Sequence, residues 1–245
     1  MRLSFLFLLL SLHCFAQTAE RTMLRLPDTG ETTSYTTTSG EDADFTINPP
    51  FFIDNHDGTV TDTVTGLMWQ VTDGGEMTIE NAFVYCDTLT LAGYNDWRLP
   101  GAHESFSILN HQLANPALDG SVFTSTGAEY WWTKDRQHND STRIWVTNAG
   151  GGIGNHPKSE TISAGGTKKF HARAVRQPVP SDFFSSHYTS TGSGTVNDLL
   201  TGLEWYALVS ADSMTWEDAL TYCDTLTANG ITDWRLPNIK ELGSL

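Results

Sequence analysis

MTIENAFVYCDTLTLAGYNDWRLP, at residues 77–100, is the most informative stretch of the sequence, because the chain repeats it as MTWEDALTYCDTLTANGITDWRLP at residues 214–237. Sixteen of the 24 aligned positions are identical. A second stretch, TVTDTVTGLMW at residues 59–69, precedes the first and recurs as TVNDLLTGLEW at residues 195–205. Two stretches that recur in the same order at nearly the same offset indicate an internal duplication.

Each copy of the longer stretch predicts an α-helix. Thr78 and Thr215 stand at the N-cap, where a threonine hydroxyl satisfies a free backbone N–H group. Gly93 and Gly230 are expected to end the two helices as C-cap glycines. Apolar residues recur at the spacing of one helix face, namely Ile79, Ala82, Phe83, Cys86 and Leu89 in the first copy and Trp216, Ala219, Leu220, Cys223 and Leu226 in the second.

Short strands are predicted around these helices. A hairpin precedes each helix, with Gly66 or Gly202 in its tight turn, because short alternating runs joined by a glycine-containing turn are typical of hairpins. A second short helix is predicted after the DWRLP turn, most clearly at residues 238–245. Further strands are predicted after the first copy only, at residues 129–133, 142–148 and 168–176.

The chain divides into four predicted parts. Residues 1–16 are expected to be a signal peptide, with a basic start, a short apolar run and small residues before the cleavage position. Residues 17–50 form a leader rich in Thr, Ser and acidic residues, with one edge strand expected at residues 23–27. Residues 51–178, the first segment, hold a complete domain. Residues 183–245, the second segment, hold a truncated copy, because a hairpin and one or two helices cannot bury their own apolar faces.

Composition and charge exclude several classes of protein. The chain has 245 residues, of which 18% are charged, and a net charge of −15. We expect no nucleic-acid partner, because phosphate contacts need clustered Lys and Arg. We expect no transmembrane segment either, since the N-terminal apolar run is too short for a bilayer. The sequence has no GxSxG, HExxH or Walker glycine loop, so we expect neither an enzyme nor a cofactor.

The cysteines and one acidic loop are candidates for reactive or metal sites. Cys86 and Cys223 remain after the signal peptide, and both lie on the apolar face of a predicted helix. We expect them to be buried, because free cysteine is among the most buried residue types; a bridge between them is the alternative, and their spacing matches no zinc site. The loop DNHDGTVTD at residues 54–62 resembles a calcium loop but fails the EF-hand register. A turn centred on Asp57 is therefore favoured.

The Asp-Trp-Arg triplet recurs identically in the two copies. An anchoring tryptophan beside an arginine–aspartate pair is more often a structural device than a ligand site. We therefore expect structural roles for Trp97, Arg98, Trp234 and Arg235, and likewise for the two cysteines.

A basic stretch interrupts the acidic chain at residues 131–176. It carries a net charge of +5 and interleaved aromatic residues. Cations pair with sulfate and aromatic rings pack on sugar faces, so the stretch could hold a sulfated sugar. The alternative is a set of solvated strand charges, with Arg173 or Arg176 paired internally. The candidate ligand residues are Lys134, Arg136, Arg143, Lys158, Lys168, Lys169 and Trp132.

An ordered series of motifs resembles a known family. At DNHDGTVTDTVTGLMWQ, the Tyr-Cys of the helix, DWRLP, the following Glu, YWW and RAVR, the chain is similar to the Lcl C-terminal domain family, long listed as a domain of unknown function and named for a bacterial collagen-like adhesin. The resemblance covers residues 51–178 nearly end to end, and the first half of a second copy in residues 183–245.

The resemblance implies an exported bacterial module with an α+β fold akin to that of C-type lectins. In the adhesin the related domain binds sulfated polysaccharides and assembles as a trimer, so the family implies an anionic polysaccharide and a homo-oligomer as partners. Many members carry a cysteine in the closing RxVR strand, where this chain has Ala174. If that cysteine normally bonds the helix cysteine, Cys86 has lost its partner.

Together these observations predict a secreted, periplasmic or surface-exposed binding module of bacterial origin, without enzymatic activity, that takes part in adhesion. The alternative is a structural or protein-interaction module of the bacterial surface that has no glycan ligand.

Overall fold

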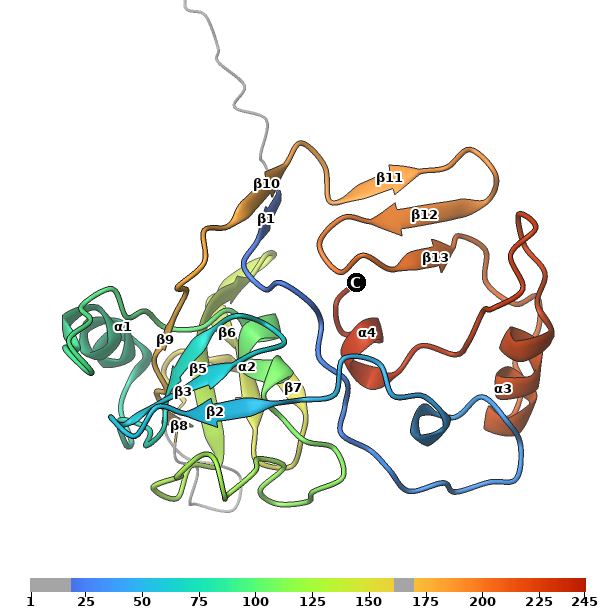
Figure 1. Cartoon of the computed structure of the whole chain (residues 1–245). Helices are drawn as coiled ribbons and strands as arrows, with labels where there is room; N and C mark the ends of the chain where they lie inside the picture. The colour runs from blue at the N-terminus through green and yellow to red at the C-terminus, as the bar shows by residue number, and fades with distance from the viewer. Residues whose placement is uncertain (1–18, 161–169) are drawn as a thin grey trace, which may run out of the picture.

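The computed structural model describes residues 19–160 and 170–245 of the chain. The expected signal peptide at residues 1–16 and two expected ligand residues, Lys168 and Lys169, lie outside these ranges. Helices and sheets are both present, which confirms the α+β class (Figure 1). Within the described ranges, no helix has the length and apolarity needed to cross a membrane.

A four-stranded antiparallel sheet opens the first segment, in the order β2-β3-β4-β9. β3 and β4 form the predicted hairpin, with Val60 opposite Trp69 and with Gly66 in the turn at φ 73°. The left-handed backbone at this turn favours glycine. The strands are β2 (Phe52–Asp54), β3 (Thr59–Asp62), β4 (Met68–Gln70) and β9 (Val175–Arg176).

A second four-stranded sheet completes the first segment, in the order β7-β6-β5-β8. β8 runs parallel to β5, with Trp131 opposite His171. The strand predicted at residues 168–176 therefore divides between two sheets, since its described part forms β8 and then β9. The sheet also contains β7, which was not predicted. The strands are β5 (Tyr130–Gln137), β6 (Asp140–Asn148), β7 (Ile153–Pro157) and β8 (Phe170–His171).

Helix α1 (Ile79–Thr88) begins at Thr78, whose hydroxyl accepts a hydrogen bond from the backbone N–H of Asn81. This confirms the predicted N-cap. The helix ends before Gly93, which is not its C-cap. Gly93 (φ 80°) instead follows Ala92 (φ 55°) in a tight turn. Two successive positive φ values are the geometry of a two-residue type I′ turn.

The core of the first segment lies between these elements. Helix α1 buries Ile79, Ala82 and Cys86, whereas Phe83 is exposed, contrary to the predicted apolar face. Helix α2 (Ala102–Ser107) packs on the other cluster. The cluster beneath α1 also contains Trp97, Leu99, Trp132, Ile144, Val146, Phe170, Ala172 and Ala174. The second cluster contains Val60, Leu67, Trp69, Phe106, Ile108, Leu109, Leu118, Phe123, Ala128, Trp131, Ala149 and Val175.

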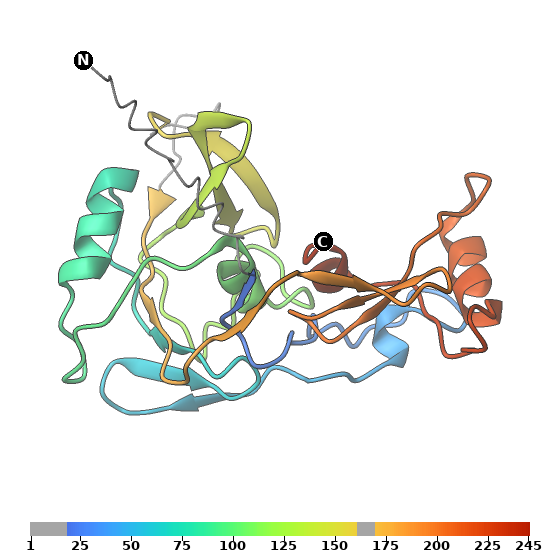
Figure 2. The ribbon, with the colours of Figure 1, turned by 90° about the horizontal axis from the view of Figure 1, so that it is seen from above.

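The second segment contains a three-stranded antiparallel sheet, β11-β12-β13, and two helices. Thr215 caps α3 as predicted. Gly230 (φ 77°) follows Asn229 (φ 54°) in the same kind of turn as Gly93 and does not cap the helix. In Figures 1 and 2, α1 and α3 lie at opposite ends of the molecule. The elements are β11 (Tyr188–Ser190), β12 (Thr195–Asp198), β13 (Glu204–Tyr206), α3 (Trp216–Thr225) and α4 (Ile239–Leu242).

The described part of the leader, from residue 19 onward, runs from the first segment to the second (Figure 1). The strand expected at residues 23–27 is absent. β1 (Ala19–Arg21) lies earlier and pairs with β10 (Asp182–Phe184). After the short 3-10 helix η1 (Asp42–Asp44) the chain returns to β2. On this path the backbone of Gly40 approaches Leu220 of α3, so the leader covers one side of the second segment.

Candidate functional site

The basic stretch does not form one basic face. Arg136 pairs across the sheet with Ile144, whereas Arg143 pairs with Pro157. Because neighbouring residues of a strand point to opposite faces, Arg136 and Arg143 lie on opposite faces of the sheet. Arg143 is also engaged internally, since its guanidinium donates to the side-chain and backbone oxygens of Asn155, at 2.6 and 2.9 Å.

Two further arginines of the stretch are internal, as the alternative interpretation allowed. Arg173 is 2% exposed and donates to the backbone oxygens of Gln70 and Val71. Burial lowers the pKa of its guanidinium to about 10. Arg176 donates to both carboxylate oxygens of Asp96, at 2.7 and 3.0 Å, so neither arginine is available to an external anion.

Arg173 belongs to a buried charge network. Asp73 accepts a hydrogen bond from Nδ1 of His171 at 2.8 Å and lies 3.6 Å from the guanidinium of Arg173. Burial alone would raise the pKa of Asp73, but the hydrogen bonds from His171 and Thr126 and the charge of Arg173 hold it well below its usual value. All three ionisable side chains are at most 2% exposed, so the network ties β8 and the loop after β4 together inside the fold.

The side chains of three expected ligand residues are exposed or partly exposed to solvent. Lys134 and Arg136 of β5 are exposed, and Lys158, which follows β7, is half-buried. Among the described residues, none of the three forms an ion pair with a carboxylate. Their charges are therefore not neutralised locally, in contrast to Arg173 and Arg176.

The expected role of Trp132 as a sugar-stacking residue is wrong. Its side chain is 1% exposed, stacks on Phe170 with 4.2 Å between ring centroids, and donates from Nε1 to the carbonyl oxygen of Met77. A ring in this position has no free face for a ligand. On β6, Trp145 is half-buried and lies on the opposite face from the buried Ile144.

The Asp-Trp-Arg triplet is built differently from the expected arginine–aspartate pair. Arg98 pairs with Glu104, six residues later, through two hydrogen bonds of 2.7 and 2.6 Å. Asp96 pairs with Arg176 instead. Trp97 is 2% exposed and donates to the carbonyl oxygen of Leu91 at 3.3 Å. These contacts close the turn between α1 and α2 onto β9.

The second segment repeats one of these pairs and lacks the other. Arg235 donates two hydrogen bonds to the carboxylate of Glu241, which also accepts from the backbone N–H of Asn238 at 3.0 Å. Asp233, at the position of Asp96, is exposed and has no ion-pair partner among residues 19–160 and 170–245. The arginine and glutamate thus stabilise the turn in both segments, whereas the aspartate has a partner only in the first.

The cysteines and the acidic loop show no reactive or metal-binding geometry within the described ranges. Cys86 is fully buried, and burial raises the pKa of its thiol to about 12; Cys223 is half-buried. Both are free, so no bridge joins them. Asp57 accepts hydrogen bonds from the backbone N–H and the hydroxyl of Thr59, at 3.1 and 2.6 Å. The described residues contain no group of three or more His, Cys, Asp and Glu side chains placed to hold a metal ion.

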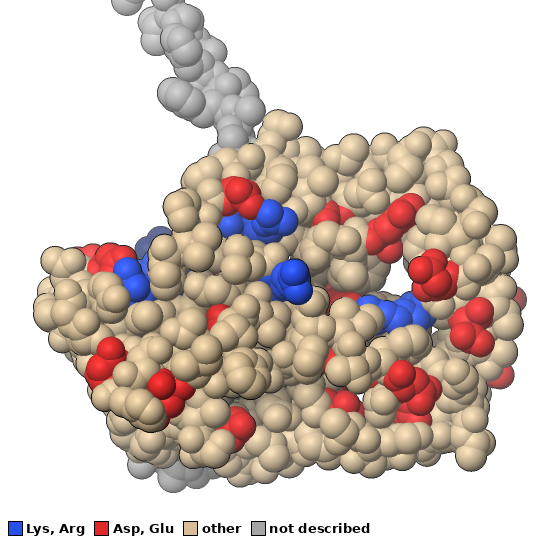
Figure 3. All heavy atoms as spheres, in the orientation of Figure 1, with Lys and Arg blue, Asp and Glu red and all other residues tan. Residues whose placement is uncertain are grey.

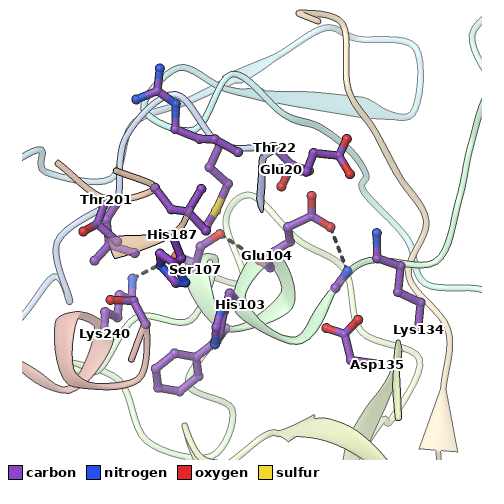
Figure 4. A pocket seen from close by; sticks show the side chains of 17 residues that line it. Glu20, Thr22, His103, Glu104, Ser107, Lys134, Asp135, His187, Thr201 and Lys240 are labelled. Atoms are coloured by element: carbon purple, nitrogen blue, oxygen red, sulfur yellow. Dashed lines mark hydrogen bonds between the residues drawn. The ribbon is translucent and has the colours of Figure 1, made fainter. Parts of the chain in front are cut away.

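A pocket that the sequence did not indicate lies where the leader, α2 and the second segment meet (Figure 4). It encloses about 200 Å³. Lys240 reaches from α4 into this junction and donates to the carbonyl oxygens of Asp28 and Ser107, at 2.7 and 2.8 Å. No local pattern predicts the pocket, because its walls come from three distant parts of the chain. Its charged and polar lining includes Glu20, Arg21, His103, Glu104, Lys134, Asp135, His187 and Lys240.

The model of the Lcl C-terminal domain family matches residues 58–176 and 194–245. No curated protein and no solved structure matches the chain. The two matched ranges contain the hairpin, the capped helix and the Arg–Glu turn of each segment.

Proposed function

Since this chain belongs to the Lcl C-terminal domain family, we propose that it is a secreted or surface-exposed binding module without enzymatic activity. Its proposed ligand is an anionic, sulfated polysaccharide, and its proposed role is adhesion. The C-type-lectin-like relationship that the motifs imply is part of the same proposal.

The observation that carries this proposal is that the basic side chains of residues 131–176 differ in whether a carboxylate neutralises them. Arg173 and Arg176 are neutralised within the fold, whereas Lys134, Arg136 and Lys158 have no carboxylate partner among the described residues. Guanidinium and ammonium groups that are open to solvent pair readily with sulfate oxygens. Lys168 and Lys169, which lie outside the described residues, add two further charges to the same stretch of sequence.

A second face of the same sheet supplies an aromatic ring. Trp145 pairs across the sheet with Asn155, and Arg143 lies two residues before it on the same face. An indole suits the apolar face of a sugar ring, whereas Nε and Nη2 of Arg143 already donate to Asn155. We therefore assign the stacking role, which Trp132 cannot fill, to Trp145, for a sugar ring on this face of the sheet, opposite to the face of Arg136.

The proposal is tested by charge reversal in the full chain. In a heparin-binding assay we expect Lys134→Glu combined with Arg136→Glu to weaken binding by about tenfold or more, because two attractive charges become repulsive. Lys168→Glu combined with Lys169→Glu is expected to act in the same direction. Arg25→Glu, at an exposed leader residue, is the control and changes the net charge by half as much as each double variant. Equal effects of the two double variants, with half that change in binding free energy for Arg25→Glu, would show that net charge alone governs binding.

The alternative function, a protein-interaction module, is favoured by a different observation. Large apolar side chains are exposed in the second segment, and exposed apolar patches commonly mark interaction sites. Oligomerisation that depends on concentration, without any affinity for heparin, would favour this alternative. The exposed residues are Phe183, Tyr188, Leu208, Val209, Met214, Trp216, Ile239, Leu242 and Leu245.

A further inference from the structure

The buried amine of Lys240, in α4, carries an inference independent of the polysaccharide proposal. Its side chain is 2% exposed and lies beside Ser107 at one wall of the pocket between the leader, α2 and the second segment (Figure 4). In α2 the equivalent position is His103, which is exposed, whereas Ser105 bonds to Thr147 of the sheet at 2.7 Å. The wall that Lys240 forms therefore corresponds to the face of α2 that the sheet leaves uncovered.

The hydrogen bonds of Lys240 match those of a neutral amine. Nζ donates to the carbonyl oxygens of Asp28 and Ser107, at 2.7 and 2.8 Å. An ammonium group has three N–H donors and no lone pair, whereas an uncharged amine has two donors and one lone pair. Among the described residues no third acceptor bonds to Nζ. In the neutral form both donors are thus satisfied and the lone pair is free.

Lys240 also differs from the buried arginines of the fold. Arg98, Arg173 and Arg235 each form an ion pair with a carboxylate. Lys240 forms none with any carboxylate that the structure describes. A buried charge without a partner is costly, and a lysine avoids that cost by losing its proton.

Several titratable groups surround Lys240, and burial outweighs their effect. The pKa of Lys240 is lowered to about 7 against the attraction of the three nearby aspartates. About half of the amine is therefore neutral at pH 7, where an exposed lysine with a pKa of about 10.4 is almost entirely protonated. The surrounding groups are Asp28 and Asp42 of the leader, Asp62 of β3, His111 after α2, and, across the pocket, Glu104 of α2 and His187 before β11.

The pocket provides room for a reaction partner. Buried lysines with a lowered pKa are nucleophiles that form Schiff bases with carbonyl compounds. The pocket encloses about 200 Å³, several times the roughly 30 Å³ that one water molecule occupies in the liquid. Thr22, Thr201 and Asp135 also line it, and their oxygen atoms suit a ligand that carries hydroxyl groups.

Charge favours an uncharged ligand. The second segment contains eight acidic residues and two basic ones, and acidic side chains are spread over its visible face in Figure 3. The field of these charges repels an anion that approaches the pocket from this side. An aldehyde with a carboxylate or phosphate group is therefore disfavoured.

We propose that Lys240 is a carbonyl-binding residue, whose amine forms an imine with a small, uncharged hydroxyaldehyde that enters the pocket. Nζ attacks the carbonyl carbon, and a carbon–nitrogen bond forms as the carbon–oxygen double bond opens. The two protons of the amine leave with that oxygen as water, and a carbon–nitrogen double bond remains. The step oxidises and reduces nothing.

Imine formation also changes the junction. The amine gives up the N–H groups that bond the carbonyl oxygens of Asp28 and Ser107. A protonated imine keeps one N–H, which bonds only one of these two oxygens. Occupation of the site thus loosens the contact that Lys240 makes between the leader and the first segment.

Reductive trapping of the full chain tests the proposal. Glycolaldehyde is the probe, and sodium cyanoborohydride reduces any imine to a stable secondary amine that mass spectrometry of peptides locates. At pH 7 we expect Lys240 to be alkylated at least about tenfold faster than Lys134 or Lys158, because a larger fraction of its amine is neutral. The difference should shrink at pH 10 and vanish in denaturing urea. Alkylation of Lys240 no faster than that of Lys134 in the native chain at pH 7 would overturn the proposal.

Two tryptophan variants test the route through the pocket. His103→Trp places a larger ring at the pocket wall and should slow alkylation of Lys240 relative to Lys158. His138→Trp, the same substitution at an exposed residue between β5 and β6, should leave that ratio unchanged. Equal and rapid alkylation of Lys240 in both variants would show that the aldehyde does not enter through the pocket, and would contradict the assigned site.

A second aldehyde tests the class of ligand. Propionaldehyde has the size of glycolaldehyde but carries a methyl group where glycolaldehyde has its hydroxyl. We expect it to alkylate Lys240 more slowly, relative to Lys158, than glycolaldehyde does, because it leaves the polar groups of the pocket without a hydrogen-bond partner. An equal or higher ratio for propionaldehyde would overturn the assignment to a hydroxyaldehyde.

Discussion

The ammonium group of Lys240, in the second segment, donates a hydrogen bond of 2.8 Å to the carbonyl oxygen of Ser107, in the first. The same nitrogen donates to the carbonyl oxygen of Asp28 in the leader. Lys240 is 2% exposed. One side chain therefore joins the three parts of the chain where they meet.

The stability of this junction should depend on pH through Lys240. Burial lowers the pKa of Lys240 to about 7, against the opposing effect of Asp62, Asp28 and Asp42. Between about pH 7 and pH 10 the unfolded chain holds a proton on Lys240 that the folded chain has released, so its contribution to folding stability rises with pH. We expect the free energy of unfolding of the wild type to rise relative to Lys240→Met over this range, by about 1 kcal/mol per pH unit. Denaturant unfolding of both proteins at several pH values measures this difference in the free energy of unfolding.

Lys134→Met, which removes an exposed lysine, is the control for this series and should follow the pH profile of the wild type. Parallel profiles for the wild type and Lys240→Met would contradict the junction role of Lys240.

Glu104 should stabilise the first segment only while it is ionised. Burial would raise its pKa, but the hydrogen bonds and charge of Arg98 hold that pKa below its usual value. Because a lowered carboxyl pKa gives stability that is present above the unfolded-state value and lost as the pH falls, Glu104→Gln should cost about 2 kcal/mol at pH 7. The cost should shrink below about pH 4.5, the ordinary value for glutamate. Urea unfolding of the wild type and of Glu104→Gln at pH 7 and at pH 3 measures this cost. Glu80→Gln, at an exposed glutamate, is the control.

The two cysteines should react at different rates. Cys86 is fully buried and the pKa of its thiol is raised to about 12, whereas Cys223 is half-buried. Since the thiolate is the reactive form, a maleimide should label Cys223 in the native protein and Cys86 only on unfolding. Mass spectrometry of the labelled peptides distinguishes the two sites. Faster labelling of Cys86 than of Cys223 in the native protein would contradict the burial of Cys86 beneath α1.

Local patterns predicted the helices and hairpins well. The spacing of Ile79, Ala82 and Cys86 and the caps at Thr78 and Thr215 are properties of neighbouring residues, so they can be read from a single sequence. The role of Gly93 was wrong, because glycine serves equally well in a C-cap and in a type I′ turn. Only the positive φ of Ala92 separates the two.

Features set by distant residues were not predicted. β1 forms where its partner β10 lies, and nothing in residues 19–21 indicates that pairing. Trp132 and Lys134 stand two positions apart on one strand, yet one is in the core and the other in solvent, because α1 and β8 cover only part of β5. The ion-pair partners of the arginines also depend on which side chains the fold brings together. Asp96 pairs with Arg176, which is 80 residues away in the chain, and not with Arg98, its near neighbour in the sequence.

The salt dependence of heparin binding by the full chain tests the proposed function most directly. If exposed lysines and arginines hold a sulfated polysaccharide, binding is saturable and weakens steeply between low and physiological salt, because ion pairs are screened and counterions are released on binding. We expect that steep dependence, and a shallower one for the Lys134→Glu and Arg136→Glu double variant. Absence of saturable binding at low salt would contradict the anionic-polysaccharide function and leave the protein-interaction module as the better explanation.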